Sequence, residues 1–173
     1  MTKYLVVDIG WFGDKDVSSI SIIHKHDEGC STVRKYREYG KTHVDVLSNI
    51  VCDTFVDYEC DFIVIDIMGA SICVYDKLCK MGLKDYMIEF KNTTQSNSDA
   101  ICRMCNDIQH NKLILDYAAK SLYDIYKSFG SDNFVYFTNN GFLKLDKSLD
   151  FNIRNKIHNI LGYYHVINKQ TLN

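Results

Sequence analysis

KYLVVDIGWFGDKDVSSISII, residues 3–23, contains two β-rich apolar runs joined by a loop that is rich in aspartate. The first run, Lys3–Asp8, predicts a strand that ends on a carboxylate. The second run, Ser18–His24, predicts the next strand. An aspartate beside a buried strand is costly unless something compensates its charge. A bound metal ion is one such compensation and a turn open to water is another, so Asp8 is the first candidate site residue.

The rest of the chain alternates between strand and helix patterns. Cys30–Tyr39 predicts a third strand, which makes the N-terminal part an antiparallel meander. The near-continuous apolar run Asp61–Met68 predicts a buried, parallel strand that carries Asp66. Helical spacing predicts four helices, at His43–Asp57, Ser71–Met81, Asp99–His110 (capped by Asn97 or Ser98) and Ala118–Phe129. Tyr86–Phe90 predicts another strand, residues 134–145 a hairpin, and residues 150–167 a last helix. This order predicts an α/β fold with a mixed sheet.

Composition places the chain among globular proteins. Its 173 residues, 46% of them hydrophobic, fit one domain that spans residues 1–173. No apolar run approaches the roughly 18 residues of a membrane span, and the N-terminus lacks a signal-peptide pattern. The seven cysteines are an odd number, which favours reduced thiols over a disulfide framework. We therefore expect no membrane partner and no secretion. A net charge of −2 argues against a simple DNA-binding module but is compatible with an acidic site that cations neutralise.

Three carboxylates stand out by position: Asp8 after the first strand, Asp66 inside the central strand, and Asp150 at the start of the last helix. If the first strand lies beside the central one, Asp8 and Asp66 converge, and the last helix could bring in Asp150. Such a cluster suits Mg²⁺ or Mn²⁺, which prefer oxygen ligands, and two such ions can hydrolyse a phosphodiester. Each residue also has a structural reading: a turn for Asp8, backbone hydrogen bonds for Asp66, and a helix N-cap for Asp150.

The same residues carry a resemblance to the ribonuclease H-like superfamily, and within it to the nuclease domain of large terminase subunits. VVDIGWFGDKDVSSISII resembles their first motif, and FIVIDIMGASICVYDKLCKMG (residues 62–82) resembles their second. GFLKLDKSLDFNIRNKIHNIL (residues 141–161) resembles their closing hairpin and acidic helix start. The resemblance implies a ribonuclease H-like mixed sheet flanked by helices, with Asp8, Asp66 and Asp150 as catalytic metal ligands.

The resemblance also implies a function. It points to a metal-dependent endonuclease that cuts concatemeric viral DNA during genome packaging by two-metal hydrolysis, in the cytoplasm or nucleus of an infected host cell. Double-stranded DNA would be the substrate. The sequence has no GxxxxGK[ST] loop, so the packaging ATPase would be separate or missing. Further candidate acids are Asp146, the rival of Asp150, and Asp16. Lys15, Lys144 and Lys147 are candidates for contact with nucleic acid.

Three alternatives stay open. The chain could be another ribonuclease H-like nuclease such as a junction resolvase, or an inactive nuclease fold that serves as an interaction module. VVDIG also resembles the phosphate motif of sugar-kinase and actin-like ATPases. The short chain and the lack of a second such motif argue against an ATPase.

Overall fold

A mixed sheet forms the centre of the protein. The computed structural model describes residues 1–10, 17–129 and 134–167. Within them the sheet has six strands in the order β5-β4-β1-β2-β3-β6. These are β1 (Thr2–Asp8), β2 (Ser18–Lys25), β3 (Ser31–Tyr39), β4 (Phe62–Asp66), β5 (Met87–Phe90) and β6 (Leu113–Leu115). β1, β2 and β3 are antiparallel neighbours, whereas β4 runs parallel to β1, β5 to β4 and β6 to β3. The predicted meander and mixed sheet are confirmed.

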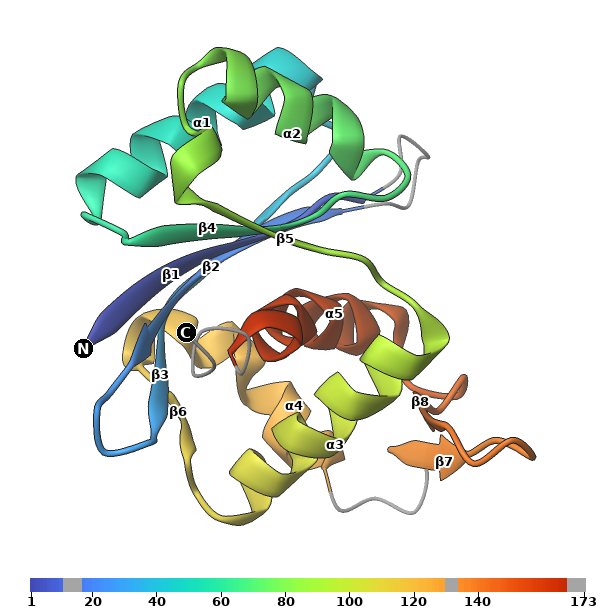
Figure 1. Cartoon of the computed structure of the whole chain (residues 1–173). Coiled ribbons are helices and arrows are strands. Elements are labelled where there is room, and N and C mark those ends of the chain that lie inside the picture. The colour runs from blue at the N-terminus through green and yellow to red at the C-terminus, as the bar shows by residue number, and fades with distance from the viewer. Residues whose placement is uncertain (11–16, 130–133, 168–173) are drawn as a thin grey trace.

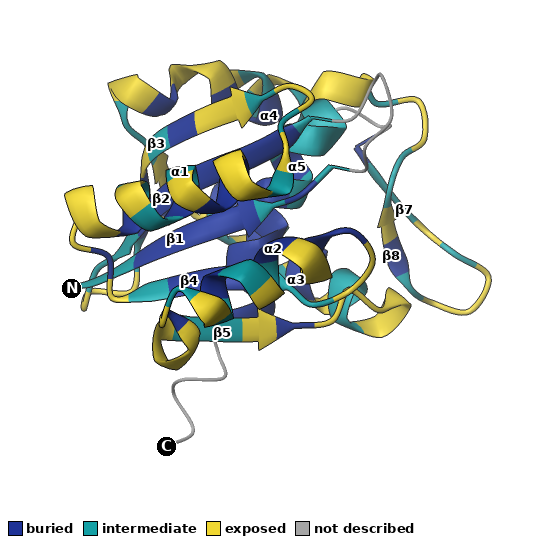
Figure 2. Cartoon of the chain, turned by 90° about the horizontal axis from the view of Figure 1, so that it is seen from above, coloured by how far each residue is buried: buried dark blue, intermediate teal, exposed yellow. Residues whose placement is uncertain are grey.

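Helices cover both faces of this sheet (Figure 1). On one face lie α1 (Val44–Asp57) and α2 (Ser71–Lys80), and on the other lie α3 (Thr94–Gln109), α4 (Tyr123–Ser128) and α5 (Phe151–Val166). Two 3₁₀ helices, Lys84–Tyr86 and Tyr117–Leu122, and a separate hairpin of β7 (Val135–Phe137) and β8 (Leu143–Leu145) complete the described elements. Figure 2 shows the buried central strands beneath the largely exposed outer faces of the helices.

Alternation along β1 and β4 determines where the two strand-ending acids point. Leu5 and Val7 pack with α1 and α2, whereas Val6 packs with α5, because successive side chains of a strand face opposite sides. On β4, Ile65 and Val64 divide between the two faces in the same way. The pattern continues to Asp8 and Asp66, which therefore both lie on the α5 face of the sheet.

Helix α5 packs unusually close to the sheet. A Cβ atom at Gly162 would stand 2.8 Å from Cγ1 of Val6, so only glycine allows this approach. The hydroxyl groups of Tyr163 and Ser31 hydrogen-bond at 2.7 Å and join the C-terminal part of α5 to the start of β3. The C-terminal half of α5 therefore packs directly against β1 at Val6.

Some predicted boundaries were wrong. Helix α3 begins at Thr94 instead of Asp99, because Thr93 and Ser96 form a capping box. Strand β4 is shorter than the predicted Asp61–Met68, since the chain turns after Asp66, whose carboxylate accepts from the Met68 N–H. The predicted helix Ala118–Phe129 is a 3₁₀ helix followed by α4, with non-helical backbone at Ala119. The last helix begins after its N-cap Asp150, as predicted.

The helices within the described ranges are all too short or too polar to span a lipid bilayer.

Candidate metal centre and adjoining groove

Asp8 and Asp66 end two neighbouring parallel strands at the same edge of the sheet. The register pairs Val7 with Ile65, so the two aspartates follow at equivalent positions. Both line one small cavity of about 20 Å³, here called the acid cavity, which has room for about one water molecule or one ion. Its lining consists of Val7, Asp8, Asp66, Phe90, Asn92, Asn97, His158, Asn159, Leu161, Gly162 and His165. The structure therefore brings these two acids to neighbouring strand ends, one sheet face and one cavity, and their role as metal ligands stays a prediction.

The environment of the pair disfavours negative charge. Burial, followed by repulsion from the Asp66 carboxylate, raises the pKa of Asp8 to about 7. Burial also raises the pKa of Asp66, although backbone N–H groups of Met68, Asn92 and Ile67 partly oppose this shift. A cation between these two carboxyl groups would stabilise their ionised forms.

Three asparagines surround the acid pair, and one of them is fully buried. Asn159, on α5, has no exposed surface. Its Nδ2 donates to the carbonyl oxygens of Val6 at 3.4 Å and Ser19 at 3.0 Å. Its Oδ1 has no hydrogen-bond partner, and leaving a buried acceptor unpaired costs about 1–3 kcal/mol. A residue that lines the acid cavity thus carries a buried oxygen that lacks a donor or a cation.

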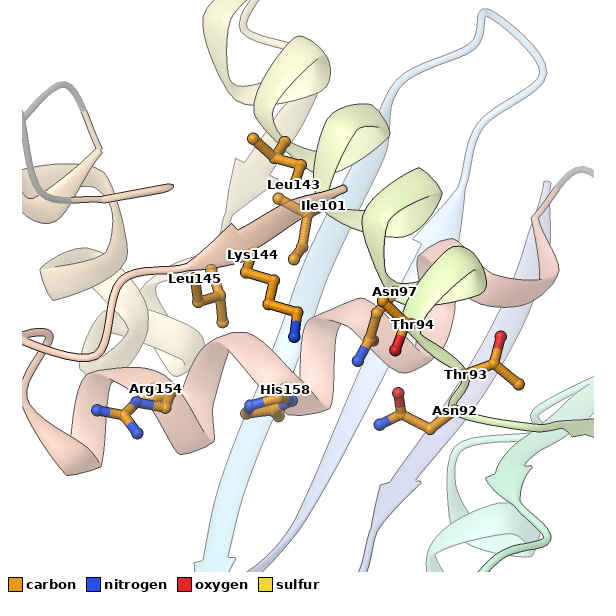
Figure 3. Close-up of a pocket in the computed structure, with 10 residues that line it drawn as sticks. All are labelled: Asn92, Thr93, Thr94, Asn97, Ile101, Leu143, Lys144, Leu145, Arg154 and His158. Carbon is orange, nitrogen blue, oxygen red and sulfur yellow. The ribbon is translucent and has the colours of Figure 1, made fainter. Parts of the chain in front are cut away.

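A larger groove adjoins the acid cavity (Figure 3). This basic groove has a volume of about 300 Å³ and is lined by Asn92, Thr93, Thr94, Asn97, Ile101, Leu143, Lys144, Leu145, Arg154 and His158. Asn92, Asn97 and His158 belong to both spaces. In Figure 3 the ammonium end of Lys144 points from the hairpin toward α5, above His158. Burial and the Arg154 charge lower the pKa of His158, so Lys144 and Arg154 supply the positive charge of the groove at neutral pH.

Asp150 and Asp146 lie apart from the acid cavity. Oδ1 of Asp150 accepts from the backbone N–H groups of Asn152 at 2.8 Å and Ile153 at 3.4 Å, which is the capping geometry. Oδ1 of Asp146 accepts from the N–H of Ser148 at 2.7 Å, and hydrogen bonds from Ser148 lower its pKa. Neither residue lines the acid cavity or the basic groove. The expectation that Asp150 projects toward the pair does not agree with this geometry, because its carboxylate turns back to its own helix.

The three predicted lysines divide in a similar way. Lys144 lines the basic groove, whereas Lys147 lies between the hairpin and α5, outside both cavities. The Lys147 carbonyl accepts from the Arg154 guanidinium at 2.7 Å. Lys15 and Asp16 lie outside the described residues. Their roles stay predictions.

The donor set can hold a hard divalent cation. Carboxylate and carboxamide oxygens suit Mg²⁺, Mn²⁺ and Ca²⁺, and the unpaired Asn159 Oδ1 adds one such oxygen to Asp8 and Asp66. Within residues 1–10, 17–129 and 134–167, no three His, Cys, Asp or Glu side chains are grouped as a metal site. A site built from these residues must therefore combine the two acids with neutral ligands.

The sheet order, the two-sided helix cover and the acids at the ends of β1 and β4 define the ribonuclease H-like fold. No protein-family model matches the sequence, and no curated protein sequence matches it either. Solved structures do match. The large terminase nuclease of the thermophilic phage G20c, crystallised with cobalt, superposes with a TM-score of 0.71 at 14% identity, over 94% of this chain and 80% of that one. The resemblance to terminase nuclease domains is thereby confirmed for the fold.

Two further structures show how wide this fold group is. The HK97 bacteriophage large terminase gives a TM-score of 0.71 at 12% identity, over 95% of this chain and 39% of that longer one. The yeast mitochondrial Holliday junction resolvase Ydc2 gives 0.54 at 8% identity, over 95% of this chain and 79% of the other. The architecture is thus common to large terminases and to a Holliday junction resolvase.

The residues of the two cavities that the sequence did not predict are mainly asparagines and basic residues. The predicted site residues do not include Asn92, Asn97, His158 or Asn159 of the acid cavity, or Arg154 of the basic groove. One signal was present: Asn159 and Gly162 lie one turn apart, beside Ile157, Ile160 and Leu161 of the last helix. A buried amide and a glycine on one helix face indicate a close approach to another element.

Proposed function

We propose that the protein is a metal-dependent nuclease of the terminase type, which cleaves double-stranded DNA by hydrolysis of a phosphodiester bond. The observation that supports it most is the placement of Asp8 and Asp66 in one cavity, on a fold that terminase nucleases share. The G20c nuclease has been crystallised with cobalt, with magnesium and with zinc, which favours a divalent cation here as well.

Asp8 and Asp66 would hold the cation, Mg²⁺ or Mn²⁺. When bound, it would activate water and offset the negative charge that builds up during hydrolysis. A second cation, as in two-metal hydrolysis, would need further oxygen ligands. The bound phosphate could supply them, and so could Asp16. Asp150, which caps its own helix, is not part of this proposal.

The basic groove would bind the DNA backbone. Lys144 and Arg154 supply positive charge, and the N-terminal end of α3 at Thr94 adds the positive end of the helix dipole, which favours phosphate. His158 and Asn97 connect this groove to the acid cavity, so a phosphate seated there would stand beside Asp8 and Asp66. The chain carries a net charge of −2, so this local positive charge would orient the substrate.

The biological setting follows from the same resemblance. A terminase-type nuclease would cut concatemeric viral DNA during packaging in an infected cell. The packaging ATPase would lie outside these 173 residues or be missing, since they contain no phosphate-binding loop of the GxxxxGK[ST] type.

Plasmid nicking tests the proposal. Purified protein should nick supercoiled DNA with Mn²⁺ and not with EDTA, and Asp8→Asn or Asp66→Asn should abolish nicking while the circular dichroism spectrum is kept. Asp53→Asn, an exposed position on α1, is the matched control and should cut normally. Full cleavage by both site variants would refute the assignment. Metal binding without cleavage would favour the interaction module.

A junction resolvase is the second candidate, because the fold also matches Ydc2. Cleavage of a four-way junction should be compared with cleavage of linear duplex of the same sequence. Equal or faster cleavage of the linear duplex supports the terminase type. Cleavage confined to the junction, with symmetric cuts, supports the resolvase.

A further inference from the structure

Asn159 is held in one orientation by the sheet. Its Nδ2 donates to the carbonyls of Val6 and Ser19, and Ser19 is the residue paired with Asp8 across β1 and β2. Carbonyl oxygens cannot donate, so the nitrogen of this amide must face them and the oxygen must face away. The structure thus assigns the two ends of the amide from its contacts.

The remaining end, Oδ1, is the unusual feature. It is buried and has no hydrogen-bond partner, while the residue lines the cavity that contains Asp8 and Asp66. Buried polar atoms without a partner are rare in folded proteins and call for an explanation. If Asn159 only joined α5 to β1 and β2, its Nδ2 alone would be sufficient for that role.

We propose that Oδ1 of Asn159 is the third protein ligand of the cation held by Asp8 and Asp66. This inference rests on the proposed function, because it names a ligand of the same site. The ligand is neutral, so the three described donors carry a charge of −2, which one divalent cation balances. Without DNA the protein should therefore bind a single Mn²⁺ ion per chain.

Two substitutions separate a ligand from a structural tie. Asn159→Leu has a similar size and removes both ends of the amide. Asn159→Asp keeps an oxygen in place of Oδ1, adds charge and removes the donor to Val6 and Ser19. A ligand role predicts that the leucine variant binds Mn²⁺ at least about tenfold more weakly, and that the aspartate variant binds it more tightly than the wild type. A structural role predicts that both variants lose stability and that neither binds Mn²⁺ more tightly.

The binding experiment uses the full chain and free Mn²⁺ measured by electron paramagnetic resonance. Asp8→Asn serves as the reference for a lost ligand. If the wild type binds no Mn²⁺, or Asp8→Asn binds it normally, the proposed function fails together with this inference. If binding needs Asp8 and Asp66 but is unchanged in Asn159→Leu, only the present inference fails.

A second measurement on the wild type avoids variants that might fold poorly. Protein labelled with ¹³C at the asparagine side-chain carbonyl is titrated with Mg²⁺, and the Asn159 signal is identified by its absence from the Asn159→Asp spectrum of the metal-free protein. Ligation predicts a saturable downfield shift of that signal, with the same Mg²⁺ dependence as the shifts around Asp8. A signal that stays in place while Asp8 responds would show that water, not the cation, satisfies Oδ1, and would overturn the proposal.

Discussion

Replacing Asp8 by asparagine should stabilise the metal-free protein above neutral pH. Burial and repulsion from Asp66 raise the pKa of Asp8 from 3.8 to about 7. Between these two pH values, Asp8 of the folded protein keeps its proton whereas Asp8 of the unfolded chain has lost it. The free energy of unfolding therefore falls as the pH rises from about 4 to about 7. A difference of about three pKa units corresponds to about 4 kcal/mol, and water near this partly buried group reduces the expected loss to about 2–4 kcal/mol. Asparagine resembles the protonated acid and escapes this loss.

Urea denaturation at pH 5 and pH 8.5, with EDTA present, measures the effect. The free energy of unfolding of the wild type should fall between the two pH values by about 1–3 kcal/mol more than that of Asp8→Asn, because Asp8 of the unfolded chain is already mostly ionised at pH 5. Asp53→Asn, on the exposed side of α1, should follow the wild type. Saturating Mn²⁺ should restore the stability of the wild type at pH 8.5 and leave Asp8→Asn unchanged. If Asp8→Asn loses as much stability between the two pH values as the wild type, the carboxylate of Asp8 is not the group that disfavours charge in the folded protein.

Three other changes test separate parts of the structure. Asp150→Ala should lower the free energy of unfolding by about 0.5–2 kcal/mol and leave Mn²⁺-dependent nicking unchanged, since it removes a cap; loss of nicking at full stability would restore Asp150 as a ligand. Gly162→Ala should destabilise by about 1–3 kcal/mol in urea, because its methyl group would overlap Val6; a gain in stability would contradict the close packing of α5. Lys144→Ala should weaken binding to duplex DNA whatever its sequence, and should lower the slope of log affinity against log salt concentration by about 1, whereas Lys80→Ala, on α2, should do neither. If both variants weaken binding equally, the basic groove is not the DNA-binding surface.

Most of the fold could be predicted from the strand patterns in the sequence. The apolar runs that end in Asp8 and contain Asp66 determine both their strands and the sheet face of the acids, because side chains alternate with a fixed period of two. Helix boundaries were harder. The capping box of α3 uses serine at a position where glutamate or glutamine is the usual signal, so the start at Thr94 was missed.

The site could be predicted only as far as its charged residues. Asp8 and Asp66 stand out because charge in an apolar run is costly, and this cost is visible in the sequence. Asp150 has two readings, cap by default and ligand by resemblance, and only the direction of its side chain separates them. Asn159 stands out because its buried Oδ1 has no hydrogen-bond partner, and no sequence pattern can reveal this.

The most direct test of the central claim is the anomalous difference map of a crystal soaked in Mn²⁺. A cation held by Asp8 and Asp66 should give a peak between their carboxylates, about 2.2 Å from an oxygen of each, as expected for a hard cation with oxygen ligands. A fully soaked crystal with no peak at this position, or with Mn²⁺ bound only elsewhere on the chain, would rule out this metal centre.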